Sequence, residues 1–326
     1  GYRKQRNLLL GQVQWNLLAQ LGMAAFEVMD WWAFNVILLT QTNARTTGDC
    51  WLRGVDASAT KGALEKAKLL RSQPIAQVSQ RAQLRNPDER VSLCDIQAET
   101  LLADLGAYGK GSTTGDSLRF LLQFWELQML TTRNVYWLDS PKQGDPWSGR
   151  SLVTSVSLDD EALQMQLGCR IHGQDVWSKR GVAVNKMKEL EPFLYAGEVF
   201  DDNVCPVVPK HERDLLPIWS FVSDPAYRKS VREVDAALKV TAGTLTKVPF
   251  DLAHWQEIAA ERYPNGLPKP YSNDPTQWLF HGHPQPATEP LQVAVARLAG
   301  YRWPAEADPA MELADEARTW LTRRQK

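Results

Sequence analysis

The spacing of hydrophobic residues along the chain follows two patterns, and the first of them predicts strands. Residues 13–22 (VQWNLLAQLG) and 34–42 (FNVILLTQT) are apolar, partly β-branched runs of the kind that form strands. The connection between them is short, so we expect the two strands to be neighbours. A third strand-like segment, CWLRGVDA, begins at Cys50.

Helical periodicity and capping residues predict four helices. The amphipathic stretch KGALEKAKLLRSQ begins at Lys61, and DPAYRKSVREVDAALKV begins with an Asp cap at Asp224 and a proline at the first helical position. A further capped helix, DLAHWQEIAAERY, begins at Asp251. The i, i+3, i+4, i+7 spacing of Leu118, Leu121, Leu122 and Trp125 predicts a helix that Asp116 or Ser117 caps.

Two other regions lack a long period. Between about 130 and 208, short strand-like pieces alternate with turn signals, which indicates a small, irregular β-rich region. Residues 263–290 carry a proline every few positions, together with Trp278, Leu279 and Phe280. This segment is expected to be an extended loop that its aromatic side chains hold on the surface.

Composition restricts the class of protein. The 326 residues are 44% hydrophobic and include 13 tryptophans, which excludes a disordered chain. The longest apolar run, residues 31–39, is far too short to span a bilayer, and the four cysteines lie far apart, so we expect a soluble, cytoplasmic protein. The formal net charge of −1 gives no global argument for nucleic acid. The chain begins without methionine in a basic helix and ends within another, so a segment of a longer polypeptide is expected.

The loop GKGSTTGDSLRF, residues 109–120, is the most suggestive local motif. It is not a Walker phosphate loop, because the required glycine is replaced by Asp104 and Lys110 is followed by Gly111. Exposed N–H groups at a helix start can still bind an anion such as a DNA phosphate. The alternative, which the local sequence alone favours, is an ordinary turn with a capped helix behind it.

Other candidate chemistry is weaker. His281 and His283 lack a neighbouring carboxylate or thiol, so packing or surface histidines are favoured over metal ligands. Aromatic residues recur beside basic ones, as in Trp177 with Lys179 and Arg180. Such pairs suit base stacking with phosphate contact, but arginine stems that cover aromatic faces at the edge of a core are the favoured interpretation.

Three stretches together resemble the downstream half of adenine-specific (N6) DNA methyltransferases of restriction–modification and phage-defence systems such as BREX and DISARM. They are the strand pair NLLAQLGMAAFE and FNVILLTQT, the loop GKGSTTGDSLRFLLQFWEL, and the segment from LKVTAG at Leu238 to HGHP. The most specific parts are T-G-D-x-x-R-F at Thr114–Phe120 and the proline-rich stretch around Trp278. The resemblance covers most of the chain.

The resemblance implies a fold of α/β plus α+β class. Residues 1–108 would form the C-terminal part of a Rossmann-like catalytic domain, of which the first strands here are the last two. Residues 109–326 would form an α+β target-recognition domain that binds DNA, with the proline-rich loop 263–290 within it. The expected partners are double-stranded DNA and other subunits of a defence system, with no membrane.

The resemblance also implies roles for individual residues. Phe26 corresponds to the aromatic residue that lies near the flipped adenine, whose lost stacking it would replace. DNA contacts are implied for the loop, and the basic side of the helix that begins at Asp224 is a further candidate. The candidate DNA-binding residues are Lys110, Ser112, Thr113, Thr114, Arg119, Arg228, Lys229 and Arg232.

Two motifs of these enzymes are missing. The chain lacks both the Gly-containing loop that binds S-adenosylmethionine and the N-P-P-aromatic motif that holds the adenine amine. The resemblance therefore implies an enzyme that is active only at full length, with the methyl donor bound mainly by a part outside this sequence. The alternative is a non-enzymatic DNA-specificity module that works with a separate catalytic subunit. A tryptophan-rich carbohydrate-binding protein is disfavoured by the arginine-heavy pairing and the lack of a secretion signal.

Overall fold

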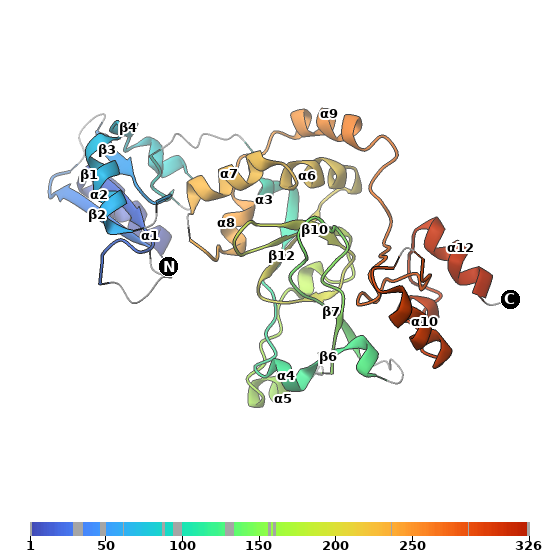
Figure 1. Ribbon diagram of the computed structural model, residues 1–326. Helices are drawn as coiled ribbons and strands as arrows, with labels where there is room; N and C mark the ends of the chain where they lie inside the picture. The colour runs from blue at the N-terminus through green and yellow to red at the C-terminus, as the bar shows by residue number, and fades with distance from the viewer. Residues whose placement is uncertain are drawn as a thin grey trace. The chain divides into compact units, whose positions relative to one another are not determined.

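The computed structural model describes residues 2–28, 35–45, 50–60, 62–86, 89–93, 100–127, 134–155, 158, 161–235, 237–285 and 287–324. The chain is a mixed α/β protein that divides into two compact units, each built from two parts of the sequence (Figure 1). Unit 1 consists of residues 1–104 and 224–251, and unit 2 consists of residues 105–223 and 252–326. No feature of the sequence predicts that residues 224–251 belong to unit 1.

Unit 1 is built on a four-stranded sheet of order β2-β1-β3-β4. β1 pairs with β2 in antiparallel orientation and with β3 in parallel orientation, and β4 pairs antiparallel with β3. The predicted strand pair is confirmed, although residues 31–34 lie outside the described residues. The strands are β1 (Gln14–Gly22), β2 (Val36–Thr42), β3 (Trp51–Asp56) and β4 (Ala76–Ser79).

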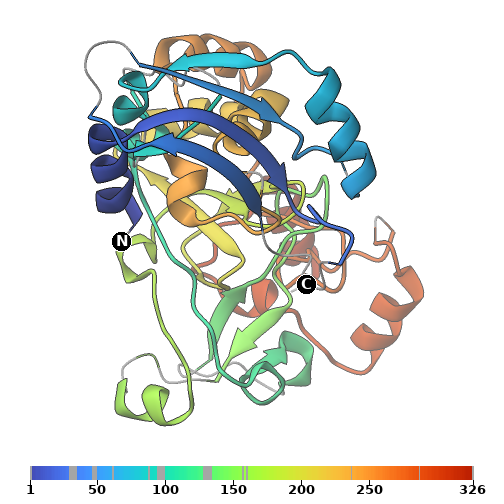
Figure 2. The same ribbon diagram turned by 90° about the vertical axis from the view of Figure 1, so that its left-hand side faces the viewer.

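Helix α1 (Tyr2–Gln12) covers one face of this sheet, and Figure 2 shows it beside the strands. Leu10 of α1 joins Trp15, Leu18, Leu52 and Val78 in one buried cluster. The side chain of Gln80 fixes the junction, because it accepts from the Trp15 N–H and donates to the carbonyls of Leu10 and Val13. Each of the latter two contacts is 2.8 Å long.

The outer strand β2 is covered far less. All of its residues are exposed or half-buried, including the apolar Ile37 and Leu38. An outer strand of this kind presents unpaired backbone groups together with apolar side chains.

The second part of unit 1 contains α7 (Pro225–Val234) and α8 (Ala242–Thr246). The predicted capping of α7 is confirmed, since Asp224 accepts from the Ala226 N–H and Pro225 opens the helix. Tyr227 and Val231, one turn apart, form its buried side, and the Tyr227 hydroxyl donates to the Leu245 carbonyl. The remaining helices of unit 1 are α2 (Ala63–Ser72), which confirms the helix predicted from Lys61, the 3₁₀ turn η1 (Ala82–Arg85), and α3 (Leu102–Leu105) at its end.

Unit 2 contains two four-stranded sheets, so the predicted β-rich region is confirmed. The first has the order β10-β9-β12-β5, and the second has the order β11-β7-β8-β6. Their strands are β5 (Gly106–Tyr108), β6 (Leu121–Gln123), β7 (Val135–Leu138), β8 (Leu152–Thr154), β9 (Gly181–Asn185), β10 (Pro192–Tyr195), β11 (Val199–Phe200) and β12 (Val204–Pro209).

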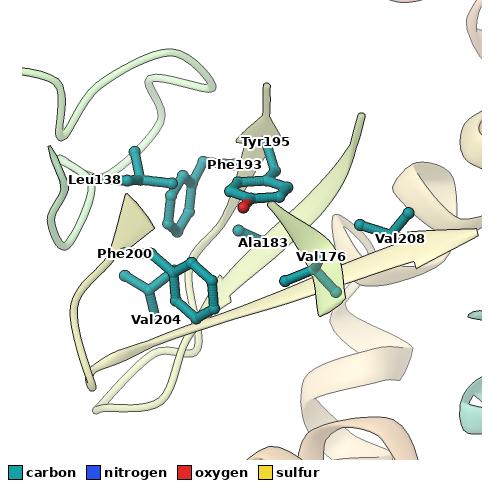
Figure 3. Close-up of a cluster of buried hydrophobic side chains, with 8 residues drawn as sticks. All are labelled: Leu138, Val176, Ala183, Phe193, Tyr195, Phe200, Val204 and Val208. Atoms are coloured by element: carbon teal, nitrogen blue, oxygen red, sulfur yellow. The ribbon is translucent and has the colours of Figure 1, made fainter. Parts of the chain in front are cut away.

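A cluster of buried side chains joins the two sheets. Figure 3 shows Phe193 and Tyr195 from β10 facing Ala183 from β9, with Leu138 from β7 and Phe200 from β11 beside them. The 3₁₀ turn η4 (Gln174–Val176) adds Val176 to the same cluster. Burial of these large apolar side chains is the main source of stability of unit 2.

Helix α6 (Leu215–Val222) packs on the first sheet of unit 2. In α6, every residue except Leu216 is buried, as expected of a helix that is apolar all round. It packs on α9 (Leu252–Arg262), whose predicted helix is confirmed. The others are α4 (Ser117–Phe120), α5 (Glu161–Gln166), α10 (Pro290–Leu298), α11 (Pro304–Ala307) and α12 (Asp315–Arg324), with short 3₁₀ turns η3 (Phe124–Glu126) and η5 (Glu212–Asp214).

The helix expected from the spacing of Leu118, Leu121, Leu122 and Trp125 is wrong. α4 ends at Phe120, and from Leu121 the chain pairs with β8 instead. Leu118 is 96% exposed, whereas Phe124, which lies off the predicted apolar face, is buried. Pairing with another strand has outweighed the local helical period.

The proline-rich loop 263–290 is irregular, as predicted. Its central apolar residues were expected to hold it on the surface, but they lie in the core. Trp278, Leu279 and Phe280 are all buried. Among the described residues, no helix combines the length and the apolarity that crossing a bilayer demands.

We predict that Lys66→Met destabilises unit 1 by about 2–4 kcal/mol. The Lys66 ammonium donates to the carbonyls of Leu21, Ala57 and Thr60, and the substitution would leave these oxygens without their donor. Hydrogen exchange of peptides from β1 and β3 over a urea series measures the change. Lys68→Met is the matched control, because Lys68 is exposed and, among the described residues, its ammonium pairs only with Glu65 on the helix surface. Equal effects of the two substitutions would contradict the prediction.

Candidate nucleic-acid interface

The loop that follows β5 forms an antiparallel pair with residues 168–173. The Thr113 N–H donates to the Arg170 carbonyl at 2.9 Å, and the Arg170 N–H donates back at 2.7 Å. The Ser112 hydroxyl donates to the His172 carbonyl and accepts from the His172 N–H. A Cβ on Gly115 would collide with the backbone of Gly168 at 2.8 Å, so the two segments run in close contact to this point.

Three N–H groups of the loop are not available for the anion nest that was one interpretation of its sequence. The N–H groups of Gly109, Ser112 and Thr113 already donate to the carbonyls of Pro206, Phe200 and Arg170. Helix α4 is a single turn, and Asp116 caps it by accepting from the Arg119 N–H at 3.2 Å. The alternative reading, a turn with a capped helix behind it, therefore describes the backbone.

The candidate residues of the loop fall into two groups. Ser112 and Thr114 are buried, and the Thr114 hydroxyl lies 3.2 Å from that of Ser117. The Thr114 carbonyl accepts from the Cys169 thiol, whose pKa is raised by burial. The Ser112 side chain bonds the partner segment, and the Thr114 side chain bonds Ser117 within its own loop, so the structure places both beneath the surface and not on it.

Lys110, Thr113 and Arg119 are exposed on the same paired segments. Arg119 lies over the Phe120 ring, with 5.1 Å between its guanidinium carbon and the ring centroid. Arg170, which the sequence analysis did not single out, is exposed directly opposite Thr113. Among the described residues, Lys110, Arg119 and Arg170 have no carboxylate within ion-pair distance. We call Lys110, Thr113, Arg119 and Arg170 the ribbon surface.

Two large apolar side chains extend this surface. Leu118 in α4 and Met165 in α5 are both almost fully exposed. The Gly115 backbone lies against Leu167 and Gly168, which follow α5, and α4 and α5 lie at the same end of unit 2 in Figures 1 and 2. The helical spacing in the sequence predicted that Leu118 is buried. This prediction failed because the spaced residues do not lie in one continuous helix.

The other candidates lie in unit 1. Arg228 and Lys229 are exposed on α7, where Lys229 and Glu233 form an ion pair at 4.0 Å. Arg232 is half-buried and donates to the Ala237 carbonyl, so it closes the end of its own helix. The structure thus divides the candidate DNA-binding residues between the two units.

Phe26 lies in the segment that follows β1 in unit 1 and is 53% exposed. Gly22, at φ +69°, has no space for a Cβ, which would lie 2.8 Å from that of Ser58. Because β1 and β3 are parallel, their carboxyl ends meet at one edge, and Lys66 bonds the carbonyls of Leu21 and Ala57 there. In open α/β sheets, ligands bind at this edge. Phe26 therefore presents an aromatic face beside such an edge.

No group of three His, Cys, Asp or Glu side chains in the described part of the chain is placed to hold a metal ion. His281 contacts the amide oxygen of Asn273 through Nε2 and accepts the His283 N–H at Nδ1. Burial, together with His283, lowers the pKa of His281 to about 4. The ring is thus neutral at physiological pH and is held within the core.

Neither a protein-family model nor a curated protein matches the sequence. Two of the solved structures with which the chain aligns are restriction–modification enzymes in complex with DNA. The Type IIL enzyme MmeI aligns over 96% of this chain and 45% of its own, with 10% identity and a TM-score of 0.40. The ATP-dependent Type ISP enzyme LlaBIII aligns over 86% of this chain and 24% of its own, with 10% identity and a TM-score of 0.38. This chain thus spans less than half the length of either enzyme.

We predict that Ser112→Ala lowers the stability of unit 2 by about 1–2 kcal/mol. The substitution removes both hydrogen bonds between the Ser112 hydroxyl and the His172 backbone. Urea unfolding followed by hydrogen exchange in β5 and β12 measures the loss. Thr113→Ala, at the exposed neighbour, is expected to stay within about 0.5 kcal/mol of the wild type. A larger loss in Thr113→Ala than in Ser112→Ala would contradict this assignment.

Proposed function

We propose that the chain is the DNA-recognition part of a site-specific adenine-N6 DNA methyltransferase in a host-defence system. The observation that carries the proposal is the ribbon surface, which gathers three cations on two paired segments without a neutralising carboxylate among the described residues. Phosphate contacts by lysine and arginine provide most of the affinity of proteins for DNA. The resemblance of Thr114–Phe120 to the recognition region of these enzymes supports the same assignment.

The shape of the ribbon surface suits a duplex. The major groove of B-DNA admits a two-stranded ribbon, and the paired segments expose Thr113 and Arg170 opposite each other. Arginine pairs with guanine in two hydrogen bonds, and apolar side chains such as Leu118 can contact the methyl group of thymine. Lys110 and Arg119 would contact phosphates and set the register.

The residues present do not fit S-adenosylmethionine. The backbone oxygens at the carboxyl ends of β1 and β3 already accept from the Lys66 ammonium, whose positive charge disfavours a sulfonium group nearby. Burial lowers the pKa of Lys66, and Asp56 partly opposes this effect. Under this proposal the methyl donor is bound mainly by a part of the enzyme outside this sequence, while Phe26 would stack on the flipped adenine.

A DNA-specificity module that works with a separate catalytic subunit is the second candidate, and the same ribbon surface favours it. The intact mass of the native gene product separates the two. A product far heavier than 36.8 kDa that carries an N-P-P-aromatic motif favours the single-chain enzyme. A native product of about this mass favours the module.

The combined substitution Lys110→Ala, Arg119→Ala, Arg170→Ala is expected to weaken duplex binding on the order of tenfold or more at low salt. It should also reduce the slope of log K against log salt by about 2, because the two phosphate contacts of Lys110 and Arg119 no longer release counterions. Fluorescence anisotropy with a mixed-sequence duplex measures both quantities. The charge-matched control is Lys68→Ala, Arg71→Ala, Arg85→Ala, at exposed positions of unit 1. Unchanged affinity and slope would remove the ribbon surface from the DNA interface.

In the enzyme that contains this chain, Phe26→Ala is expected to lower methyl transfer on the order of tenfold or more while duplex affinity changes less than threefold. The Phe26 ring would contact only the extruded base, so its loss lowers the rate of methyl transfer and not the affinity for the duplex. Transfer of a labelled methyl group to DNA, together with anisotropy, measures the two effects. Phe26→Trp should retain activity. Equal activity of the alanine variant and the wild type would show that Phe26 has no part in the reaction.

A further inference from the structure

Helix α10 carries a row of exposed apolar side chains. Leu291, Val295 and Leu298 are 77%, 57% and 89% exposed. They stand at positions i, i+4 and i+7 of the helix, so they lie on one side of it, with the small Ala294 among them. We call these four residues the α10 stripe. Single exposed apolar side chains are common on protein surfaces, but three along one side of a helix are typical of a face that packs on a partner.

The opposite side of α10 anchors the helix to unit 2. Val293 is fully buried. The Nε atom of Arg297 donates to the Gly282 carbonyl at 2.8 Å, and its Nη1 atom donates to the Glu306 carboxylate at 2.9 Å. The guanidinium carbon lies 5.3 Å from the centroid of the Trp303 ring. Because the helix is already held in place, a partner does not have to order the α10 stripe before it binds.

The ends of α10 limit the length of the stripe. Pro290 stands at the first helical position, where its missing N–H costs nothing. Gly300, at φ +82°, ends the helix, and the Tyr301 N–H donates to the Ala296 carbonyl at 2.9 Å. A helix of nine residues is about 14 Å long, so the stripe matches one partner helix of similar length.

The stripe itself carries no charge, whereas its two ends carry opposite charges. Glu289 directly precedes α10 and Arg302 follows it closely, and both are exposed. Among the described residues, neither of them has a partner within ion-pair distance. A partner helix that suits this face is therefore apolar along its middle, basic where it meets Glu289 and acidic where it meets Arg302.

A second α10 in antiparallel orientation has this distribution. Leu291 of each copy would then contact Leu298 of the other, and the small Ala294 would face the larger Val295 on both sides of a twofold axis. The acidic end of each helix would meet the basic end of the other, and the helix dipoles would oppose each other favourably.

The other described helices do not offer a matching face. Among the described residues, no helix besides α10 has three large apolar side chains exposed on one side. A second copy of the chain would therefore be bound through α10 on both sides. A contact in which both copies use the same surface has twofold symmetry and closes at the dimer.

We propose that two copies of this chain associate through the α10 stripe in an antiparallel helix pair. The proposal does not rest on the function proposed above, because no residue of the stripe belongs to the ribbon surface. One short helix from each copy makes a small interface, and small interfaces are transient, so we expect a dissociation constant on the order of 10–100 μM.

Sedimentation velocity of the full chain over a concentration series measures the association. We expect the mass to rise from 36.8 kDa towards twice this value over a range of about 1–300 μM. The double variant Leu291→Glu, Leu298→Glu places like charges opposite each other and is expected to raise the dissociation constant by about tenfold or more. The matched control is Leu8→Glu, Leu64→Glu, at exposed leucines of α1 and α2.

Disulfide formation under mild oxidation measures the orientation of the two helices. In a Cys50→Ser, Cys94→Ser background, the remaining cysteines are buried. Val295→Cys lies beside the expected twofold axis, so its two copies are close enough to form a disulfide. The two copies of Leu291→Cys would lie about 10 Å apart along the helices and should not join. A mixture of Leu291→Cys and Leu298→Cys chains should form the mixed disulfide.

A dimer that the two glutamates weaken and the control pair leaves unchanged, together with a disulfide at position 295, supports the proposal. A chain that stays monomeric throughout the series overturns it, and so does a dimer that the glutamates do not weaken. A disulfide that forms more readily in Leu291→Cys than in Val295→Cys also overturns it, because the helices would then not be antiparallel. If the double glutamate variant fails to fold, Val295→Lys replaces it with the same expected weakening.

Discussion

Arg150 connects, through its side chain and its backbone together, three segments of unit 2 that are far apart in sequence. It is fully buried, and its donors reach Ser148, Leu194 and Glu198, while its backbone bonds Gln277 and Trp278. A buried arginine is tolerated only where its charge and its N–H groups are satisfied, so these segments can pack in one arrangement only. Two sheets and the proline-rich loop depend on that arrangement. The apolar cluster of Figure 3 adds stability around a geometry that the polar contacts specify.

Unit 1 uses the same device in a simpler form. The Lys66 side chain extends from α2 to three carbonyl oxygens, so one ammonium group joins the ends of β1 and β3 to the loop that follows β3. Gln80 joins α1 to the sheet in a comparable way. In both units, hydrogen bonds from a long polar side chain join elements that a larger core would hold by apolar contact. The sheets have only four strands each, so the apolar contact area is small.

Local patterns in the sequence predicted several helices and strands well. They predicted poorly which segments pair with each other and which side chains become buried. The strand pair, α2, α7 and α9 follow from period and capping, because those signals act within a few residues. The helix predicted through Trp125 failed, since pairing of Leu121–Gln123 with β8 depends on residues thirty positions away. Lys110 and Arg119 were candidates from the resemblance of the loop, and the structure exposes both, but the burial of Ser112 and Thr114 arises from the partner segment 168–173. Arg170 had no signal, because long-range pairing alone brings it to its site.

The ribbon surface has a consequence for how such a protein can change. Its two segments are held by hydrogen bonds between backbone atoms and by the buried Ser112, so the side chains at Lys110, Thr113, Arg119 and Arg170 contribute little to keeping the backbone in place. Substitution at these four positions therefore changes the free energy of unfolding little. The glycine and hydroxyl residues between them are constrained by their contacts. A surface built this way can exchange its outward side chains over generations, or in a combinatorial library, while the scaffold beneath it stays the same.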